Sequence, residues 1–224
     1  MTARLRNVLL IGILLTVVAL PILAQGTFQN LNFESAVLVP APGGPVGAWQ
    51  FDQAFPGWTG YIGGQVQTTS FPGGVPIGPP GQTPFIGILY PPLWNAPQGS
   101  YELGFGAGLD VSGSFIPVAL GQNGQVPSGA KSLQFLALYA PAVFLSGQQL
   151  PSVRLGSGPS TRSLFGVDIS NFAGQMAELR FQPGLGIDYL DAIQFSDQQI
   201  PEPSTLGLFS LSALLLALRA RRRS

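Results

Sequence analysis

Three aspartates near the end of the chain, Asp188, Asp191 and Asp197, are its densest group of side chains that could do chemistry. Two carboxylates could serve as acid and base in glycoside cleavage, or could coordinate a hard cation such as calcium. A third interpretation, which we favour, is that they cap or solvate a hairpin loop. The chain has no histidine and no cysteine, which excludes most hydrolase triads, thiol nucleophiles and nearly every zinc site. We therefore predict no catalytic residue and a protein that is not an enzyme.

Four aromatic side chains in stretches rich in glycine and proline form a second candidate group: Trp49, Trp58, Tyr61 and Trp94. Aromatic faces on loops stack on sugar rings, whose C–H faces are apolar. Such residues also plug the ends of β-sandwiches, and core packing is the alternative that we favour for Trp58. Trp58, Tyr61 and Trp94 are the candidate glycan contacts.

The charges of the chain are unevenly placed. Six of the ten cations lie near the two ends, so the region 25–200 has four cations against nine acidic residues, a net charge of −5. An acidic body with one lysine offers no patch for phosphate backbones, so we expect no nucleic-acid partner.

The first 24 residues have the layout of a secretory signal peptide. Arg4 and Arg6 precede an apolar run, 8–20, which is followed by Pro21 and by Ala24 as the small residue at the cut. We predict cleavage by signal peptidase after Ala24, with an uncleaved membrane anchor as the alternative. Both alternatives translocate the rest of the chain.

The last 24 residues form a second processing signal with three parts. Pro201, Glu202 and Pro203 precede an apolar run, Leu206 to Leu218, and four arginines close the chain: Arg219, Arg221, Arg222 and Arg223. The 13-residue run makes a helix of about 20 Å, which Ser204 and Thr205 extend toward the hydrocarbon thickness of about 30 Å. The arginines hold the end of this helix, 204–218, in the cytoplasm as a basic stop, so the body lies outside.

This tail resembles the PEP-CTERM sorting signal of bacterial exported proteins. Residues 201–203 match the signature tripeptide of that family, 206–218 its membrane helix, and 219–223 its basic terminus. The resemblance implies that an exosortase, a membrane cysteine protease, recognises the tail and removes it, so the motif makes the chain a substrate. A simple C-terminal anchor after a chance Pro-Glu-Pro is the alternative.

Between the two signals the apolar residues alternate with period 2, which predicts β-strands. The alternating stretches are 28–34, 100–105, 133–139, 165–169, 177–181 and 193–195, and 85–90 is a continuous apolar run that suits a strand buried on both faces. Glycine- and proline-rich turns separate these stretches, and 39–83 is expected to be a long, partly irregular excursion. We predict one all-β domain over 25–200, a single β-sandwich similar to a jelly roll.

Several short segments of the body resemble galactose-binding-like jelly rolls. They are Asn30–Glu34 as an opening strand, Pro56–Thr59 as a Gly-Trp segment, 172–181 as the penultimate strand and Leu190–Phe195 as the closing strand. Domains of that kind often carry a structural calcium between the first and last strands. By this resemblance Glu34 and Asp191 are the candidate calcium ligands, and we expect no other cofactor.

These observations favour a non-enzymatic, exported protein of the bacterial envelope or extracellular matrix, tethered to the inner membrane before an exosortase processes it. The alternative is a carbohydrate-binding module that acts on exopolysaccharide. A carboxylate-based glycosidase or lyase is the least favoured possibility.

Overall fold

The computed structural model describes residues 26–44, 46–72, 83–92 and 94–200. The predicted signal peptide (1–24), the tripeptide 201–203, the predicted membrane helix (204–218) and the basic tail (219–224) lie outside the described residues. Within the described part of the chain, no helix combines the length and the hydropathy that a membrane span requires.

Strands dominate the described chain, as the period-2 pattern predicts. An eight-stranded sheet has the order β1-β4-β5-β6-β16-β10-β14-β13. Its strands are β1 (Trp49–Gln50), β4 (Thr69–Pro72), β5 (Phe85–Leu89), β6 (Glu102–Gly106), β10 (Ser132–Ala137), β13 (Ser152–Ser157), β14 (Ser163–Asp168) and β16 (Asp188–Ser196). All neighbours in this sheet are antiparallel except β4 and β5, which are parallel.

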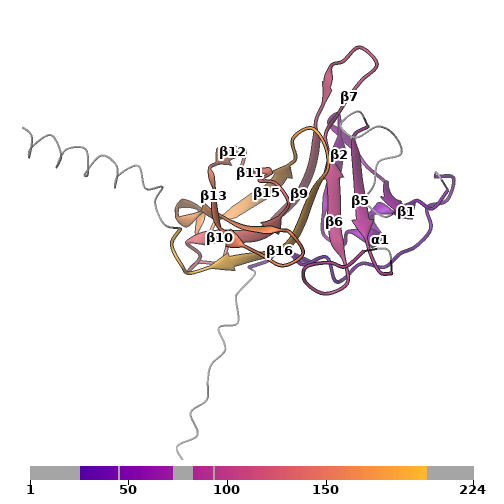
Figure 1. The fold of residues 1–224 in the computed structure, drawn as a ribbon. Coiled ribbons are helices and arrows are strands. Elements are labelled where there is room, and N and C mark those ends of the chain that lie inside the picture. The colour runs from indigo at the N-terminus through magenta and orange to yellow at the C-terminus, as the bar shows by residue number, and fades with distance from the viewer. Residues whose placement is uncertain (1–25, 45, 73–82, 93, 201–224) are drawn as a thin grey trace, which may run out of the picture.

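A six-stranded antiparallel sheet has the order β12-β11-β15-β9-β2-β3. Its strands are β2 (Thr59–Ile62), β3 (Gln65–Val66), β9 (Val118–Gln125), β11 (Ala142–Leu145), β12 (Gln148–Leu150) and β15 (Met176–Gln182). The remaining elements are the small pair β7 (Gly108–Leu109) and β8 (Phe115–Ile116), helix α1 (Phe51–Ala54) and the 3-10 turn η1 (Ser170–Phe172). In Figure 1 the early elements β1, α1, β5 and β6 gather on one side of the molecule, and β10 to β13 lie on the other.

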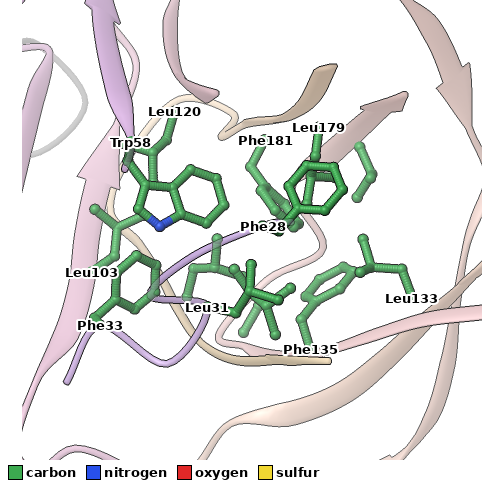
Figure 2. Close-up of a cluster of buried hydrophobic side chains, with 14 of the residues drawn as sticks. Phe28, Leu31, Phe33, Trp58, Leu103, Leu120, Leu133, Phe135, Leu179 and Phe181 are labelled. Carbon is green, nitrogen blue, oxygen red and sulfur yellow. The ribbon is translucent and has the colours of Figure 1, made fainter. Parts of the chain in front are cut away.

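The two sheets share one buried apolar cluster. Leu103 of β6 and Phe135 of β10 come from the eight-stranded sheet, whereas Leu120 of β9 and Phe181 of β15 come from the six-stranded sheet. Figure 2 shows these side chains in one cluster, with Leu103 and Leu120 near Trp58 and Phe135 on the far side. Aromatic pairs tie the sheets together, such as Phe135 and Phe181, whose ring centroids lie 5.3 Å apart edge to face.

Burial confirms two of the predicted strands, one with alternating burial and one covered on both faces. In β15 every second residue points into the core, Ala177, Leu179 and Phe181 being buried. In β5 all five residues are buried, so the continuous apolar run does form a strand covered on both faces.

The predicted opening strand at 28–34 is wrong. Leu31 and Phe33 are fully buried, as their spacing suggested, but the segment consists of turns. Asn30 and Phe33 have positive φ angles of 49° and 60°, which a strand does not allow. The Asn30 side chain accepts a hydrogen bond from the N–H of Ser35 at 2.9 Å, and this local bond favours a turn over a sheet ladder.

The region 39–83 is more regular than predicted. It contains β1, α1, β2, β3 and β4 in the described residues. Gly63 and Gly64 join β2 to β3 in a two-residue hairpin, with φ angles of 58° and 79° that suit glycine. Trp49 and Tyr61, which we expected in loops, therefore lie in the short strands β1 and β2.

Candidate functional site

The loop 94–101, which precedes β6, is held by three carboxylates. Glu34 Oε1 accepts hydrogen bonds from the N–H groups of Ser100 and Tyr101, at 2.9 and 2.8 Å. Asp191 Oδ2 accepts one from the N–H of Gln98 at 3.1 Å. The indole N–H of Trp94 donates to Glu102 Oε2 at 2.5 Å. Three acidic side chains from distant parts of the chain therefore fix one loop.

Gly99 permits this arrangement. Its φ is +68°, and a Cβ atom there would lie 2.3 Å from the carboxylate carbon of Glu34. Only a residue without a side chain allows the loop to approach Glu34 so closely.

A buried ion pair lies beside this loop. Arg162 Nε lies 2.7 Å from Glu102 Oε1, and its Nη2 lies 2.9 Å from Oε2, so the contact is bidentate. The side chains of Arg162 and Glu102 are 3% and 0% exposed. The guanidinium also lies 4.3 Å from the ring centroid of Tyr189 and 5.5 Å from that of Trp94. We call Glu102, Arg162, Trp94 and Tyr189 the arginine clamp.

Asp188 and Asp191 lie within strand β16 and are buried, so the hairpin loop that we favoured for them is wrong. Asp188 Oδ1 accepts hydrogen bonds from the N–H groups of Tyr139 and Tyr189, at 2.9 and 2.8 Å. Burial raises the pKa of Asp188 to about 6, and these N–H groups oppose the rise. Asp197 follows the strand and is exposed.

The pKa of Asp191 is raised to about 7. Burial is the main cause, and the nearby carboxylates of Glu102 and Glu34 add to it. The N–H groups of Ala192 and Gln98 favour the charged form and act against the rise. Glu34 and Asp191, which the resemblance paired as candidate calcium ligands, both accept hydrogen bonds from the loop 94–101.

The predicted calcium ligands therefore share a neighbourhood, but their oxygens face main-chain donors. Calcium takes six to eight oxygen ligands, whereas N–H groups repel a cation. Among the described residues, no three or more acidic, histidine or cysteine side chains gather in a way that could hold a metal ion. The geometry does not favour calcium, and its binding by Glu34 and Asp191 stays a prediction.

Trp58 belongs to the shared core. It is 5% exposed, its ring lies 5.9 Å from that of Phe33 and 6.4 Å from that of Phe181, and its indole N–H donates to the carbonyl of Asn30 at 3.0 Å. These contacts agree with core packing, the alternative that we favoured for this residue.

Tyr61 and Trp94 are half-buried and stack on other side chains. The guanidinium of Arg180 lies 4.9 Å from the ring centroid of Tyr61. Trp94 lies 5.0 Å from the ring centroid of Tyr189 within the arginine clamp. The two rings lie in different parts of the fold and form no common platform with Trp58; glycan contact stays a prediction for all three.

An open cavity of about 580 Å³ lies beside α1, β2 and β4. Its lining includes the polar residues Gln50, Asp52 and Gln67, and also Trp58, which is 5% exposed. Amide and carboxylate groups in a concave site can form hydrogen bonds with a hydroxyl-rich ligand.

Sequence reasoning missed the arginine clamp. Glu102 stands between Tyr101 and Leu103 in an alternating stretch, which suggests a solvent-facing carboxylate, yet it is completely buried. Nothing in the spacing of residues 102 and 162 indicates that they meet. The one available signal was the small number of cations in the body, which made Arg162 a scarce partner for nine acids.

The chain remains fixed to the domain up to its last described residue. The N–H of Lys131 donates to the carbonyl of Ser196, and the hydroxyl of Ser132 donates to the carbonyl of Gln198, at 2.8 and 2.7 Å. Ile200 is 8% exposed. The described chain is thus held by the domain as far as Ile200.

Residues 199–223 match the model of the PEP-CTERM protein-sorting motif. No curated protein and no solved structure matches the chain significantly.

This match defines the class of protein. The chain is an exported protein of the bacterial envelope or extracellular space that is sorted through its C-terminus and tethered to the membrane before processing. Its processing partner is an exosortase, and the resemblance of the tail to PEP-CTERM signals is confirmed.

Proposed function

We propose that this chain is a non-enzymatic passenger protein, a β-sandwich that exosortase processing delivers to the cell envelope or the extracellular matrix. The observation that carries the proposal is the sorting motif at 199–223, whose first two residues are also the last described residues of the all-β body. A signal peptide over 1–24 and a membrane helix over 204–218 complete the proposed precursor.

The internal contacts of the body support a structural role. Asp188 and Asp191 are buried and accept main-chain N–H groups, so they do not line an open cleft as the acid and base of a glycosidase would. Trp58 is committed to the core and Trp94 to the arginine clamp.

The sandwich architecture and its likeness to galactose-binding-like jelly rolls are part of the proposal. Two sheets that bury one common apolar cluster support it. The penultimate and closing strands of the resemblance correspond to β15 and β16, whereas its opening strand is replaced by turns.

The test compares the protein in its host with and without the exosortase. We expect a shorter, membrane-released form in the first strain and a full-length, membrane-bound form in the second, with both mature termini identified by mass spectrometry. A tail that stays attached in both strains would reduce the motif to a simple anchor and contradict the proposal.

Exopolysaccharide binding is the second candidate function, because Gln50, Asp52 and Gln67 line the open cavity. Affinity electrophoresis of the mature protein in gels that contain the host polysaccharide measures it. We expect Gln67→Ala to abolish any retardation, whereas Gln98→Ala, an exposed glutamine of the loop 94–101, leaves it unchanged. Equal mobility of the wild type with and without polysaccharide would exclude this candidate.

A further inference from the structure

The matched sorting signal and the folded body overlap. The match begins at Gln199, and the structure describes the chain up to Ile200, so two residues belong to both. Ile200 is buried, yet it lies outside the central cluster of the two sheets. The last residue before Pro201 therefore packs at a separate site on the domain, formed by Gly166 and Leu155, which we call the Ile200 seat.

Gly166 of β14 forms the floor of that seat. A Cβ atom on Gly166 would lie 2.3 Å from Ile200 Cδ1 and 2.8 Å from Leu155 Cδ1. Ile200 thus occupies the space that a side chain at position 166 would take, and Leu155 of β13 lies next to it. The carbonyls of Ser196 and Gln198 accept hydrogen bonds from Lys131, which precedes β10, and from Ser132, its first residue, and these bonds direct the chain toward this seat.

When Ile200 is bound to the domain, only a short segment is available to a protease between the domain and the apolar run. Five residues separate Ile200 from Leu206, the start of the apolar run, and a chain of that length spans at most about 20 Å. A protease that acts at the motif must take an extended peptide into its cleft, and the residues before Pro201 are held by the domain. Cleavage then follows the fraction of molecules in which this segment has left the domain.

We propose that Ile200 and its Gly166 seat form a latch that holds the segment 197–200, just before Pro201, on the folded domain, and that exosortase acts on the unlatched form. Ile200 is a positioning residue for processing. Burial of one isoleucine side chain biases such an equilibrium by about ten- to a hundredfold, so release of the latch raises the processing rate by about that factor. The inference rests on the proposed exosortase processing.

The test alters the seat and leaves the matched segment 199–223 intact. Gly166→Ala places a methyl group where Ile200 lies, and it is introduced into the full-length precursor in the exosortase-bearing host. Gly156→Ala in the neighbouring strand β13 is the matched control, because a Cβ atom there meets no described atom within 4 Å. Pulse-chase labelling measures the initial rate at which the tail is lost, and limited proteolysis of the precursor reports whether 197–200 has become accessible.

A second variant keeps the proposal testable if Gly166→Ala misfolds. Insertion of Gly-Ser-Gly-Ser between Gln198 and Gln199 separates the intact motif from the hydrogen-bonded anchor at Ser196 and Gln198. We expect each variant to be processed at least about tenfold faster than the wild type, the combination to be no faster than either, and Gly156→Ala to match the wild type.

The outcomes separate the two hypotheses. The latch is overturned if the wild type is processed and the rate is unchanged in the insertion variant, or in a Gly166→Ala variant whose 197–200 segment is accessible. The proposed function is then retained. Absence of processing in the wild type would contradict the proposed function itself.

Discussion

Removal of the Arg162 guanidinium should destabilise the body strongly. Arg162→Met keeps the length and apolar stem of the side chain but leaves the Glu102 carboxylate, which is 0% exposed, with only the indole N–H of Trp94 among its described charge-stabilising contacts. An uncompensated buried charge of this kind costs about 3–5 kcal/mol. That is a large fraction of the roughly 5–15 kcal/mol by which domains are stable.

Urea unfolding of a 26–200 fragment, followed by tryptophan fluorescence, measures the free energy of unfolding. The double variant Glu102→Met with Arg162→Met removes both charges and should recover most of the loss, because a well-packed apolar pair replaces a buried ion pair at little cost. Arg180→Met is the control: the Arg180–Glu178 pair is about one-third exposed, so its loss should cost at most about 1 kcal/mol.

The result that refutes this reasoning is specific. If Arg162→Met costs no more than Arg180→Met, Glu102 is better solvated than its burial indicates. If the double variant is no more stable than the single one, the loss comes from packing of the guanidinium on Tyr189 and Trp94 and not from the unpaired carboxylate.

Three further predictions concern the core, the buried acids and the tail. Trp58→Ala should lower the free energy of unfolding by about 3–5 kcal/mol, since the ring is surrounded by core side chains; a melting point within a few degrees of the wild type would contradict this. Because the folded pKa of Asp188 is about 6 against 3.8 for the free group, the free energy of unfolding should fall by about 2 kcal/mol as the pH rises from 4 to above 6. Asp188→Asn keeps an oxygen acceptor for the same N–H groups and should remove that part of the slope in EDTA-containing buffer; parallel curves for the two proteins would count against it. Replacement of Pro201, Glu202 and Pro203 by alanines should leave membrane insertion intact and block tail removal, as measured by precursor size and membrane partition; unimpaired maturation would show that the tripeptide is not recognised.

The pattern of apolar residues along the chain was enough to predict strands whose burial follows a simple rule. The alternation of Ala177, Leu179 and Phe181 and the apolar run of β5 predicted their strands, because inward and outward side chains must alternate on a sheet and a doubly covered strand has no polar face. The same pattern failed at Leu31 and Phe33, where the two side chains reach the core from turns. Burial alone does not specify the backbone when Asn30 offers a competing local hydrogen bond.

The sequence by itself determined the sorting class of this protein, because the matched motif is one contiguous segment, residues 199–223. Tertiary structure alone decided what the acids of the body do. Glu34, Glu102 and Asp191 are far apart in the chain, and only the pairing of β6 with β16 and the course of the loop 94–101 bring them to one place. The Ile200 seat could not be predicted from the sequence either, because the role of Gly166 depends on the chain returning over β14 and placing Ile200 beside it. Contacts between residues distant in the sequence depend on the order of strands in the sheet, and hydrophobic periodicity along the chain contains no information about that order.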